Sequence, residues 1–169
     1  MKSDRISCRR SQYMMLQAGM DAPQFELPDA DMEMFNLESQ RGKKIIVLYF
    51  YPKDDTPGCT MEANEFSDLV DDFVRLDALV VGVSRDECLS HAEFRDKYGL
   101  SVLLLSDVDS KVCKKYGVLY DKEVEGHKRA AIQRSTFVID KQGKLRHALY
   151  GVHAHGHAHE ILDRIKELK

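Results

Sequence analysis

One run of residues constrains the fold more than any other part of the sequence. Residues 43–52 read KKIIVLYFYP, a continuous series of β-branched and aromatic side chains bounded by lysines and a proline. A strand of this kind is apolar on both faces, which is typical of a parallel sheet covered by helices. A polar turn with Pro57 and Gly58 follows, and apolar residues then recur at helical spacing. The sequence therefore predicts a buried strand, a tight turn and an amphipathic helix over residues 59–75.

The rest of the chain alternates strands with helices. A small hairpin is predicted over residues 25–37, and further strands at 78–83, 102–105, 135–139 and 145–152. Helices are predicted at 88–98, 110–116 and 157–168. Residues 119–130 are charged and lack periodicity, so we expect a loop there. This order predicts an α/β protein with a thioredoxin-like fold: an N-terminal β-hairpin and a central mixed sheet flanked by helices on both faces.

Length and charge limit the organisation of the chain. It has 169 residues, the size of one domain. Its formal net charge of −3 gives no reason to expect binding to nucleic acid, and no apolar run approaches the roughly 18 residues of a membrane span. Residues 1–17 are polar and basic without the apolar stretch of a signal peptide. We therefore expect a disordered extension over 1–17, a single domain over 18–169 and a cytoplasmic location.

The cysteines are candidates for chemistry rather than for cross-links. They are Cys8, Cys59, Cys88 and Cys113, and no two of them are spaced as C-x-x-C or as zinc ligands. A chain without a signal peptide is expected to keep free thiols. The chemistry of a reactive thiol can be served by turn N–H groups, Thr56 and a nearby arginine, so we expect no metal and no cofactor. Cys113 lies among residues patterned for the core, and Cys8 lies in the predicted extension.

Histidines cluster near the end of the chain. Four of them alternate, at His153, His155, His157 and His159. Two on one strand face could bind a metal, but no carboxylate or cysteine completes a ligand set, which favours a polar strand end that leads into a surface helix. The remaining histidines are expected on exposed segments, at His91, His127 and His147.

Cys59 lies at the junction of the buried strand and the predicted helix. Main-chain N–H groups in the first turn of a helix have no intrahelical partner and the helix dipole is positive there, so a thiolate is stabilised. Pro57 suits a helix start, because it has no N–H group to leave unpaired. The Thr56 hydroxyl, three residues before the sulfur, can donate or accept a hydrogen bond. This setting predicts a nucleophilic cysteine; the alternative is a cysteine that merely packs as a small apolar residue.

The sequence resembles the peroxiredoxins, specifically the peroxiredoxin Q (bacterioferritin comigratory protein) subfamily. The resemblance extends from about Ala18 to the C-terminus. It rests on four motifs: APQF at 22–25, YFYPKDDTPGCT at 49–60, LSD at 105–107 and RSTFVID at 134–140. It implies a thioredoxin fold, which agrees with the predicted order of elements.

The resemblance also implies a role for each motif residue. Cys59 would be the peroxidatic cysteine, whose thiolate attacks the O–O bond of a peroxide and becomes a sulfenic acid. Thr56 would bind the peroxide and Pro52 would shield the sulfur from solvent. Glu62 would orient the active-site arginine, which matches Arg134 at the head of RSTFVID.

Two assignments stay open in the sequence. Arg129 competes with Arg134 as the positive charge near the sulfur. The resolving thiol is the second: relatives place it five residues after the peroxidatic cysteine or on the next helix, and Asn64 and Arg95 occupy these positions here. Cys88, two helical turns before Arg95, is a possible resolving residue. We expect instead a cycle completed mainly by an external thiol.

A thiol-dependent peroxidase acting on hydrogen peroxide and organic hydroperoxides, in antioxidant defence, is the function that these residues favour. The external reductant would be thioredoxin, glutaredoxin or a small thiol, and the protein a monomer or weak homodimer. A thioredoxin-like disulfide oxidoreductase is the enzymatic alternative, but it requires C-x-x-C and residues 56–59 read TPGC. A non-catalytic thioredoxin-fold binding module is the other alternative.

Overall fold

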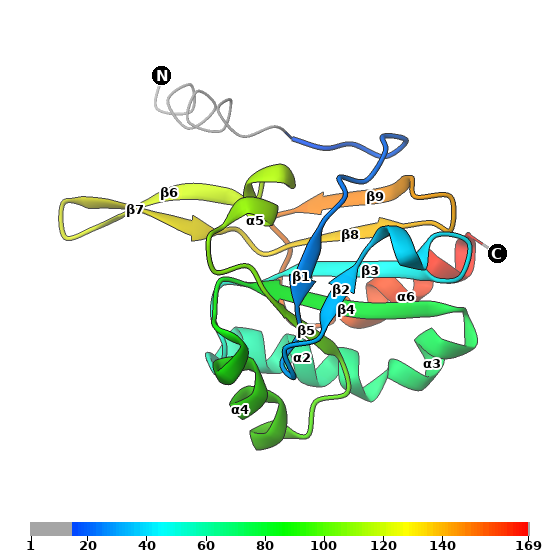
Figure 1. Ribbon diagram of the computed structural model, residues 1–169, viewed down its shortest axis with the longest axis horizontal. Helices are drawn as coiled ribbons and strands as arrows, with labels where there is room; N and C mark the ends of the chain where they lie inside the picture. The colour runs from blue at the N-terminus through cyan, green and yellow to red at the C-terminus, as the bar shows by residue number, and fades with distance from the viewer. Residues whose placement is uncertain (1–14, 169) are drawn as a thin grey trace.

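A five-stranded mixed sheet forms the centre of the structure, a computed structural model that describes residues 15–168 (Figure 1). In spatial order its strands are β5 (Leu103–Ser106), β4 (Ala78–Ser84), β3 (Ile45–Phe50), β8 (Ser135–Ile139) and β9 (Leu145–Tyr150). The predicted buried strand is the central one, and every residue of β3 is buried. β3 runs parallel to β4 and antiparallel to β8. The predicted thioredoxin-like α/β fold is confirmed.

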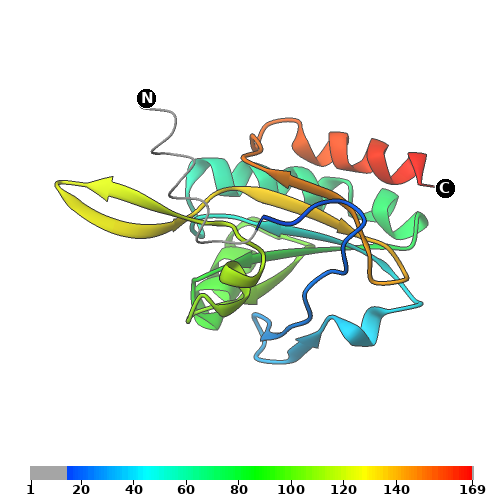
Figure 2. The same ribbon diagram turned by 90° about the horizontal axis from the view of Figure 1, so that it is seen from above.

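Four helices of the described chain cover one face of the sheet; Figure 2 shows the C-terminal helix on this side and the N-terminal hairpin on the other. They are α2 (Pro57–Asp68), α3 (Val70–Arg75), α4 (Cys88–Tyr98) and α6 (His157–Glu167). Phe66, Phe73, Phe94 and Ile161, one from each helix, pack in a single apolar cluster with the inward side chains of β3 and β4. This face therefore carries the helix that begins beside Cys59.

The opposite face is covered mainly by the first part of the described chain. The antiparallel hairpin β1 (Glu26–Pro28) and β2 (Met34–Asn36) lies across it, followed by the 3-10 helix η1 (Glu38–Gln40). The short helix α5 (Lys111–Lys115) completes this layer. Together these elements bury a second apolar cluster against the sheet.

The segment expected to be a loop is a second hairpin, and that prediction is wrong. Strands β6 (Leu119–Val124) and β7 (His127–Ile132) pair in antiparallel register and extend beyond the sheet (Figure 1). Most of their side chains are exposed, so no apolar alternation marks them in the sequence. Glu125 and Gly126 at the turn both have positive φ, which a tight hairpin turn requires.

The predicted helix over residues 59–75 is two helices. It begins at Pro57 and is interrupted at Leu69, whose φ and ψ of −100° and 5° end α2 before α3 begins. At the other boundary, Leu16 belongs to the predicted extension but is buried, and its N–H donates to Tyr150 Oη over 2.9 Å. Residues 1–14 of the predicted extension, with Cys8, lie outside the described residues.

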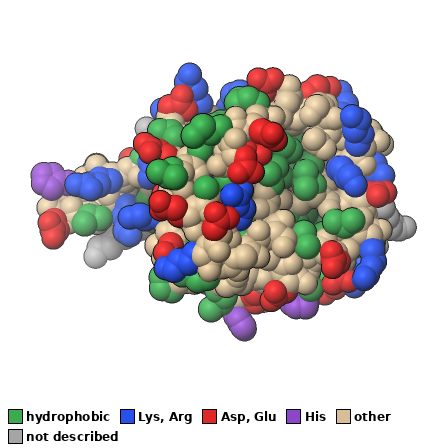
Figure 3. Space-filling view, turned by 60° about the horizontal axis from the view of Figure 1, so that its bottom comes forward, with side chains coloured by type: hydrophobic (Ala, Val, Ile, Leu, Met, Phe, Trp, Pro, Cys, Tyr) green, Lys and Arg blue, Asp and Glu red, His purple; other side chains and the backbone are tan. Residues whose placement is uncertain are grey.

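The outer surface mixes charges of both signs. Figure 3 shows acidic and basic side chains interspersed over one face, with the β6–β7 hairpin projecting from the body. Among residues 15–168, no helix has the length and apolar character needed to cross a membrane.

Candidate active site

Cys59 lies in the first turn of α2, directly after the loop that follows β3. The helix starts at Pro57, with Thr56 as its N-cap, and the first intrahelical bond runs from Thr60 N to Thr56 O over 2.8 Å. No side chain caps this end. The N–H groups of Gly58 and Cys59 therefore belong to the uncapped positive end of a helix. Cys59 itself is only 2% exposed and packs at the edge of the apolar cluster beneath α2.

Sheet register brings an arginine to this sulfur. β3 and β8 pair with Phe50 opposite Ser135, so Arg134 lies just past the end of β3. Arg134 Nη2 donates to Cys59 Sγ over 3.4 Å. The competing candidate, Arg129, is exposed on β7 and pairs in register with Lys122. The structure thus places Arg134 at the sulfur, as the sequence favoured.

Glu62, one turn after Gly58 on α2, anchors the same guanidinium. Arg134 Nη1 donates to Glu62 Oε1 over 2.7 Å, and the Glu62 side chain is fully buried. Its second oxygen, Oε2, has no hydrogen-bond partner among the described residues. Burial raises the pKa of Glu62 from 4.5 to about 7, against the opposing attraction of Arg134. Burial also lowers the pKa of Arg134, but the nearby Glu62 and Cys59 outweigh it, so the net direction is upward.

A Glu62→Gln variant should reveal this buried carboxyl in the pH dependence of folding. A carboxyl with a raised native pKa contributes stability below its unfolded pKa of 4.5, and this contribution is lost as the pH rises through about 7. Glu62→Gln has no carboxyl to titrate at this position, so its unfolding free energy lacks this decrease with pH. Relative to Glu62→Gln, the wild type should lose about 3 kcal/mol of unfolding free energy between about pH 4.5 and 7. Urea denaturation of both proteins at about pH 5 and about pH 8 measures the difference; parallel pH profiles would contradict it.

The two remaining motif residues lie in the loop before α2. Thr56 is half-buried, and its hydroxyl donates to Lys53 O over 2.8 Å. Because the hydroxyl proton is engaged, Thr56 presents acceptor lone pairs in this conformation. Pro52 is exposed directly after the buried Tyr51.

Comparison with known proteins agrees with this geometry. Residues 18–148 match the AhpC/TSA family. The chain belongs to the peroxiredoxins. It is 41% identical over 155 residues to peroxiredoxin Bcp of Bacillus subtilis, covering 92% of this chain and 98% of the relative. It is 38% identical over 152 residues to peroxiredoxin Bcp of Escherichia coli, covering 90% and 97%.

Solved structures match at the level of the whole fold. The bacterioferritin comigratory protein of Xanthomonas campestris, whose structures address its alkyl peroxide reduction activity, superposes with a TM-score of 0.83 and 33% identity. That match covers 89% of this chain and 98% of the other. A Cys-to-Ser variant of Xylella fastidiosa PrxQ superposes with a TM-score of 0.85 and 34% identity, covering 92% and 98%. These matches identify the chain as a thiol-dependent peroxidase of the peroxiredoxin Q type and favour neither alternative class.

The other described cysteines of this peroxiredoxin differ in burial. Cys113 is fully buried, and burial together with Asp107 raises the pKa of its thiol well above the usual range. It is therefore placed as a structural residue, as predicted. Cys88 is the half-buried first residue of α4. Cys59, Cys88 and Cys113 are all free thiols.

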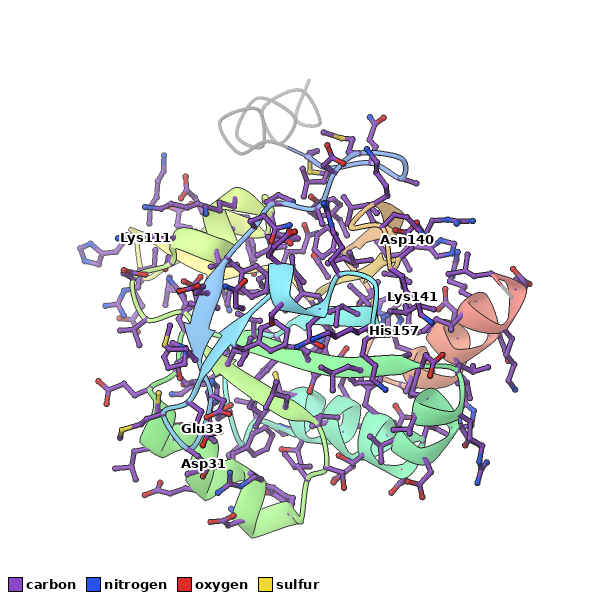
Figure 4. All side chains as sticks on the ribbon, turned by 45° about the vertical axis from the view of Figure 1, so that its right-hand side comes forward. Asp31, Glu33, Lys111, Asp140, Lys141 and His157 are labelled. Atoms are coloured by element: carbon purple, nitrogen blue, oxygen red, sulfur yellow. The ribbon has the colours of Figure 1, made fainter. Side chains whose placement is uncertain are left out.

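The two positions at which the family resemblance implies a resolving thiol are occupied by polar residues. Asn64 is half-buried on α2. Arg95, on α4, donates from Nη1 to both carboxylate oxygens of Asp31 over 3.1 Å. Figure 4 labels Asp31 at the turn of the β1–β2 hairpin, beside α4. An exposed ion pair therefore fills the second position.

Two histidines are buried where the sequence indicated exposure. His91 on α4 is fully buried, so the prediction that it is solvated is wrong: its ring contacts Asp54 and Leu105. His157 is labelled in Figure 4. Its Nε2 shares a hydrogen bond of 2.8 Å with Thr136 Oγ1, and burial lowers the pKa of the His157 ring. His153 and His155 are exposed, as a polar strand end implies.

Sequence reasoning missed the burial of Asp54 and the closeness of Gly58 to Arg134, whose Nη2 would lie 3.1 Å from a Cβ at residue 58. Asp54 is buried in the loop between β3 and α2, and with Asp86 and His91 it places ligand-type atoms within 4.8 Å of one another. Both nitrogens of His91 already face acceptors in the protein, which marks a hydrogen-bonded network. A buried acid in the polar turn KDDT has no distinguishing signal, since its neighbour Asp55 is exposed.

Proposed function

We propose that Cys59 is the peroxidatic cysteine and that it reduces hydrogen peroxide and organic hydroperoxides. The observation that carries this proposal is the contact of Arg134 Nη2 with Cys59 Sγ at 3.4 Å, made by a guanidinium that Glu62 fixes from the other side. A fixed positive charge at a helix start favours the thiolate, which is the nucleophilic form.

Each group then has a part in the reaction. The Cys59 thiolate attacks one peroxide oxygen, the S–O bond forms as the O–O bond breaks, and the other oxygen leaves as hydroxide or alkoxide. Arg134 and the N–H groups at the start of α2 stabilise the charge that develops on the leaving oxygen. Thr56 accepts a hydrogen bond from the protonated peroxide oxygen, because its own proton is held by Lys53 O. Pro52, exposed over the loop, limits access of water to the sulfur.

Peroxide consumption by the pure protein with dithiothreitol tests this function. The proposal expects catalytic turnover of hydrogen peroxide and of cumene hydroperoxide. Turnover no faster than that of dithiothreitol alone would reject it, and would favour a non-catalytic binding module.

Gly58→Ala should slow the peroxide reaction without a large loss of stability. A Cβ at residue 58 would lie 3.1 Å from Arg134 Nη2, the nitrogen that contacts Cys59 Sγ. The guanidinium would have to shift by a few tenths of an ångström, which weakens a contact whose geometry matters for the transition state. We expect a decrease of about 3- to 10-fold in the single-turnover rate. Urea denaturation of wild type and variant checks that stability is kept; an unchanged rate in Gly58→Ala would show that this contact is unimportant.

Turnover also needs a reductant, and we propose an external one. Thioredoxin, glutaredoxin or a small thiol would reduce the sulfenic acid, since Asn64 and Arg95 occupy the positions of a resolving thiol. Cys88 is the possible internal substitute. The free thiols of the described chain fit a reducing compartment, so we propose a cytoplasmic enzyme, acting in antioxidant defence as a monomer or weak homodimer.

A further inference from the structure

The loop that precedes Cys59 is tied to α4 through one buried carboxylate. Asp54 Oδ1 accepts from Tyr51 Oη over 2.6 Å. Asp54 Oδ2 accepts from Ser90 Oγ over 2.8 Å and lies 2.7 Å from His91 Nδ1. Ser90 and His91 belong to the first turns of α4, whereas Asp54 lies five residues before Cys59. The Asp54 side chain thus ties the loop both to Tyr51 at the end of β3 and to α4.

The geometry of His91 shows that a proton links it to Asp54. Its Nε2 faces the carbonyl oxygen of Leu105 at 2.9 Å, an acceptor only, so Nε2 carries a proton. Its Nδ1 faces a carboxylate oxygen, and two acceptors cannot lie 2.7 Å apart without a proton between them. The side chains of His91 and Asp54 are 0% and 4% exposed. Removing the His91 ring would leave a buried carboxylate with one donor fewer, and the loss of a donor to a buried charge costs free energy.

The other ties of this loop, to α4 and to the segment just before α4, differ in strength. The main-chain N–H of Asp54 donates to Asp86 Oδ2 over 2.8 Å, which fixes the backbone at the same residue. Asp55 pairs with Lys97 over 2.8 Å and accepts from Tyr98 Oη, but the Lys97 and Asp55 side chains are 58% and 42% exposed. Exposed ion pairs contribute little because water and salt screen them. The buried contact of Asp54 with His91 therefore dominates.

We propose that Asp54 and His91 are positioning residues for the reaction at Cys59: their buried contact, here called the latch, holds the loop before Cys59 against α4. Closed, the latch keeps Thr56 and the first turn of α2 in place, so that Cys59 meets Arg134. With the latch broken, this segment loosens, and Cys59 becomes more exposed and less well placed for the peroxide. The peroxide step that this positioning serves rests on the proposed function.

Alkylation by N-ethylmaleimide measures the latch without any peroxide chemistry. Cys59 is 2% exposed, so a reagent of this size reaches the sulfur only when the loop opens. Cys113, 0% exposed on the opposite face of the sheet, reports global opening in the same molecule. His91→Gln keeps an amide donor for Leu105 O but removes the donor to Asp54. Ser90→Ala removes the weaker of the two side-chain bonds from α4.

The expected result is selective exposure of Cys59. Peptide mapping of the reduced protein should show Cys59 alkylated about tenfold faster in His91→Gln, and less so in Ser90→Ala, with Cys113 unchanged. In the same variants the single-turnover peroxide rate should fall while the Cys59 alkylation rate rises. A loss of stability alone would not move the two rates in opposite directions with Cys113 unchanged.

Tyr116→Phe is the matched control. It removes a buried hydrogen bond of similar kind, from Tyr116 Oη to Pro23 O over 2.7 Å, on the face away from the loop. Its Cys59 and Cys113 rates should keep their wild-type ratio. Equal acceleration of Cys59 and Cys113 in His91→Gln, or acceleration of neither, would overturn the latch. If selective exposure appears while the wild type consumes no peroxide, the latch stands and the proposed function fails.

Discussion

Replacing Cys59 by serine should reduce single-turnover peroxide reduction to the background rate. The reaction begins with attack by the thiolate, and a serine hydroxyl stays protonated at neutral pH even beside Arg134. Among the described residues, Cys59 is the thiol that Arg134 contacts, and Glu62 fixes that arginine from the other side. We expect a loss of at least about 1,000-fold, followed in stopped-flow mixing with hydrogen peroxide.

The matched controls are the same substitution at the other described cysteines. Cys113→Ser places a hydroxyl in the core and Cys88→Ser changes the first residue of α4, and both should retain the peroxide step. Activity that survived in Cys59→Ser but disappeared in Cys88→Ser would move the reaction to α4 and reject the assignment.

Replacing Arg134 by methionine should have the second largest effect. The variant loses the charge that lies 3.4 Å from Cys59 Sγ and leaves the buried Glu62 without its partner. The leaving oxygen should lose a charge-assisted donor, and the sulfur should lose the positive charge that favours its nucleophilic form. We expect peroxide reduction to slow by about 10- to 100-fold, followed in stopped-flow mixing with hydrogen peroxide.

Arg129→Met is the control for this charge. It makes the same chemical change on the exposed face of β7, so the peroxide rate should stay at the wild-type value. Equal peroxide rates in wild type and Arg134→Met would show that the guanidinium does not assist the reaction. A decrease in Arg129→Met alone would restore Arg129 as the better candidate.

The sequence predicted those parts of the site that depend on local chain order. The apolar run of residues 43–52 predicted the buried β3, and Pro57 marked the first residue of α2. The place of Cys59 in the first turn of a helix follows from these two predictions, because it lies two residues after Pro57. The role of Arg134 needed the family motif, since only the register of β3 with β8 brings Phe50 opposite Ser135.

The errors arise where tertiary contacts override the local pattern. His91 lies on a helix whose outward residues are mostly polar, and only its pairing with Asp54, 37 residues earlier, explains its burial. The β6–β7 hairpin is held by its own ladder with both faces largely exposed, so no period of two appears in its apolar residues. A periodic pattern also continues across Leu69 although the backbone leaves the helix there.

The most direct test of the account is mass spectrometry of the protein after one equivalent of hydrogen peroxide in the presence of dimedone. The account predicts one dimedone adduct, mapped to Cys59, and no peptide in which Cys59 is cross-linked to Cys88, because Cys59 is buried in the first turn of α2 and Cys88 begins a different helix, α4. Without dimedone or thiol, further peroxide should convert Cys59 to the sulfinic acid. A stoichiometric Cys59–Cys88 disulfide would show that Cys88 resolves the sulfenic acid. An adduct on Cys88 or Cys113, with Cys59 unmodified, would contradict the central claim.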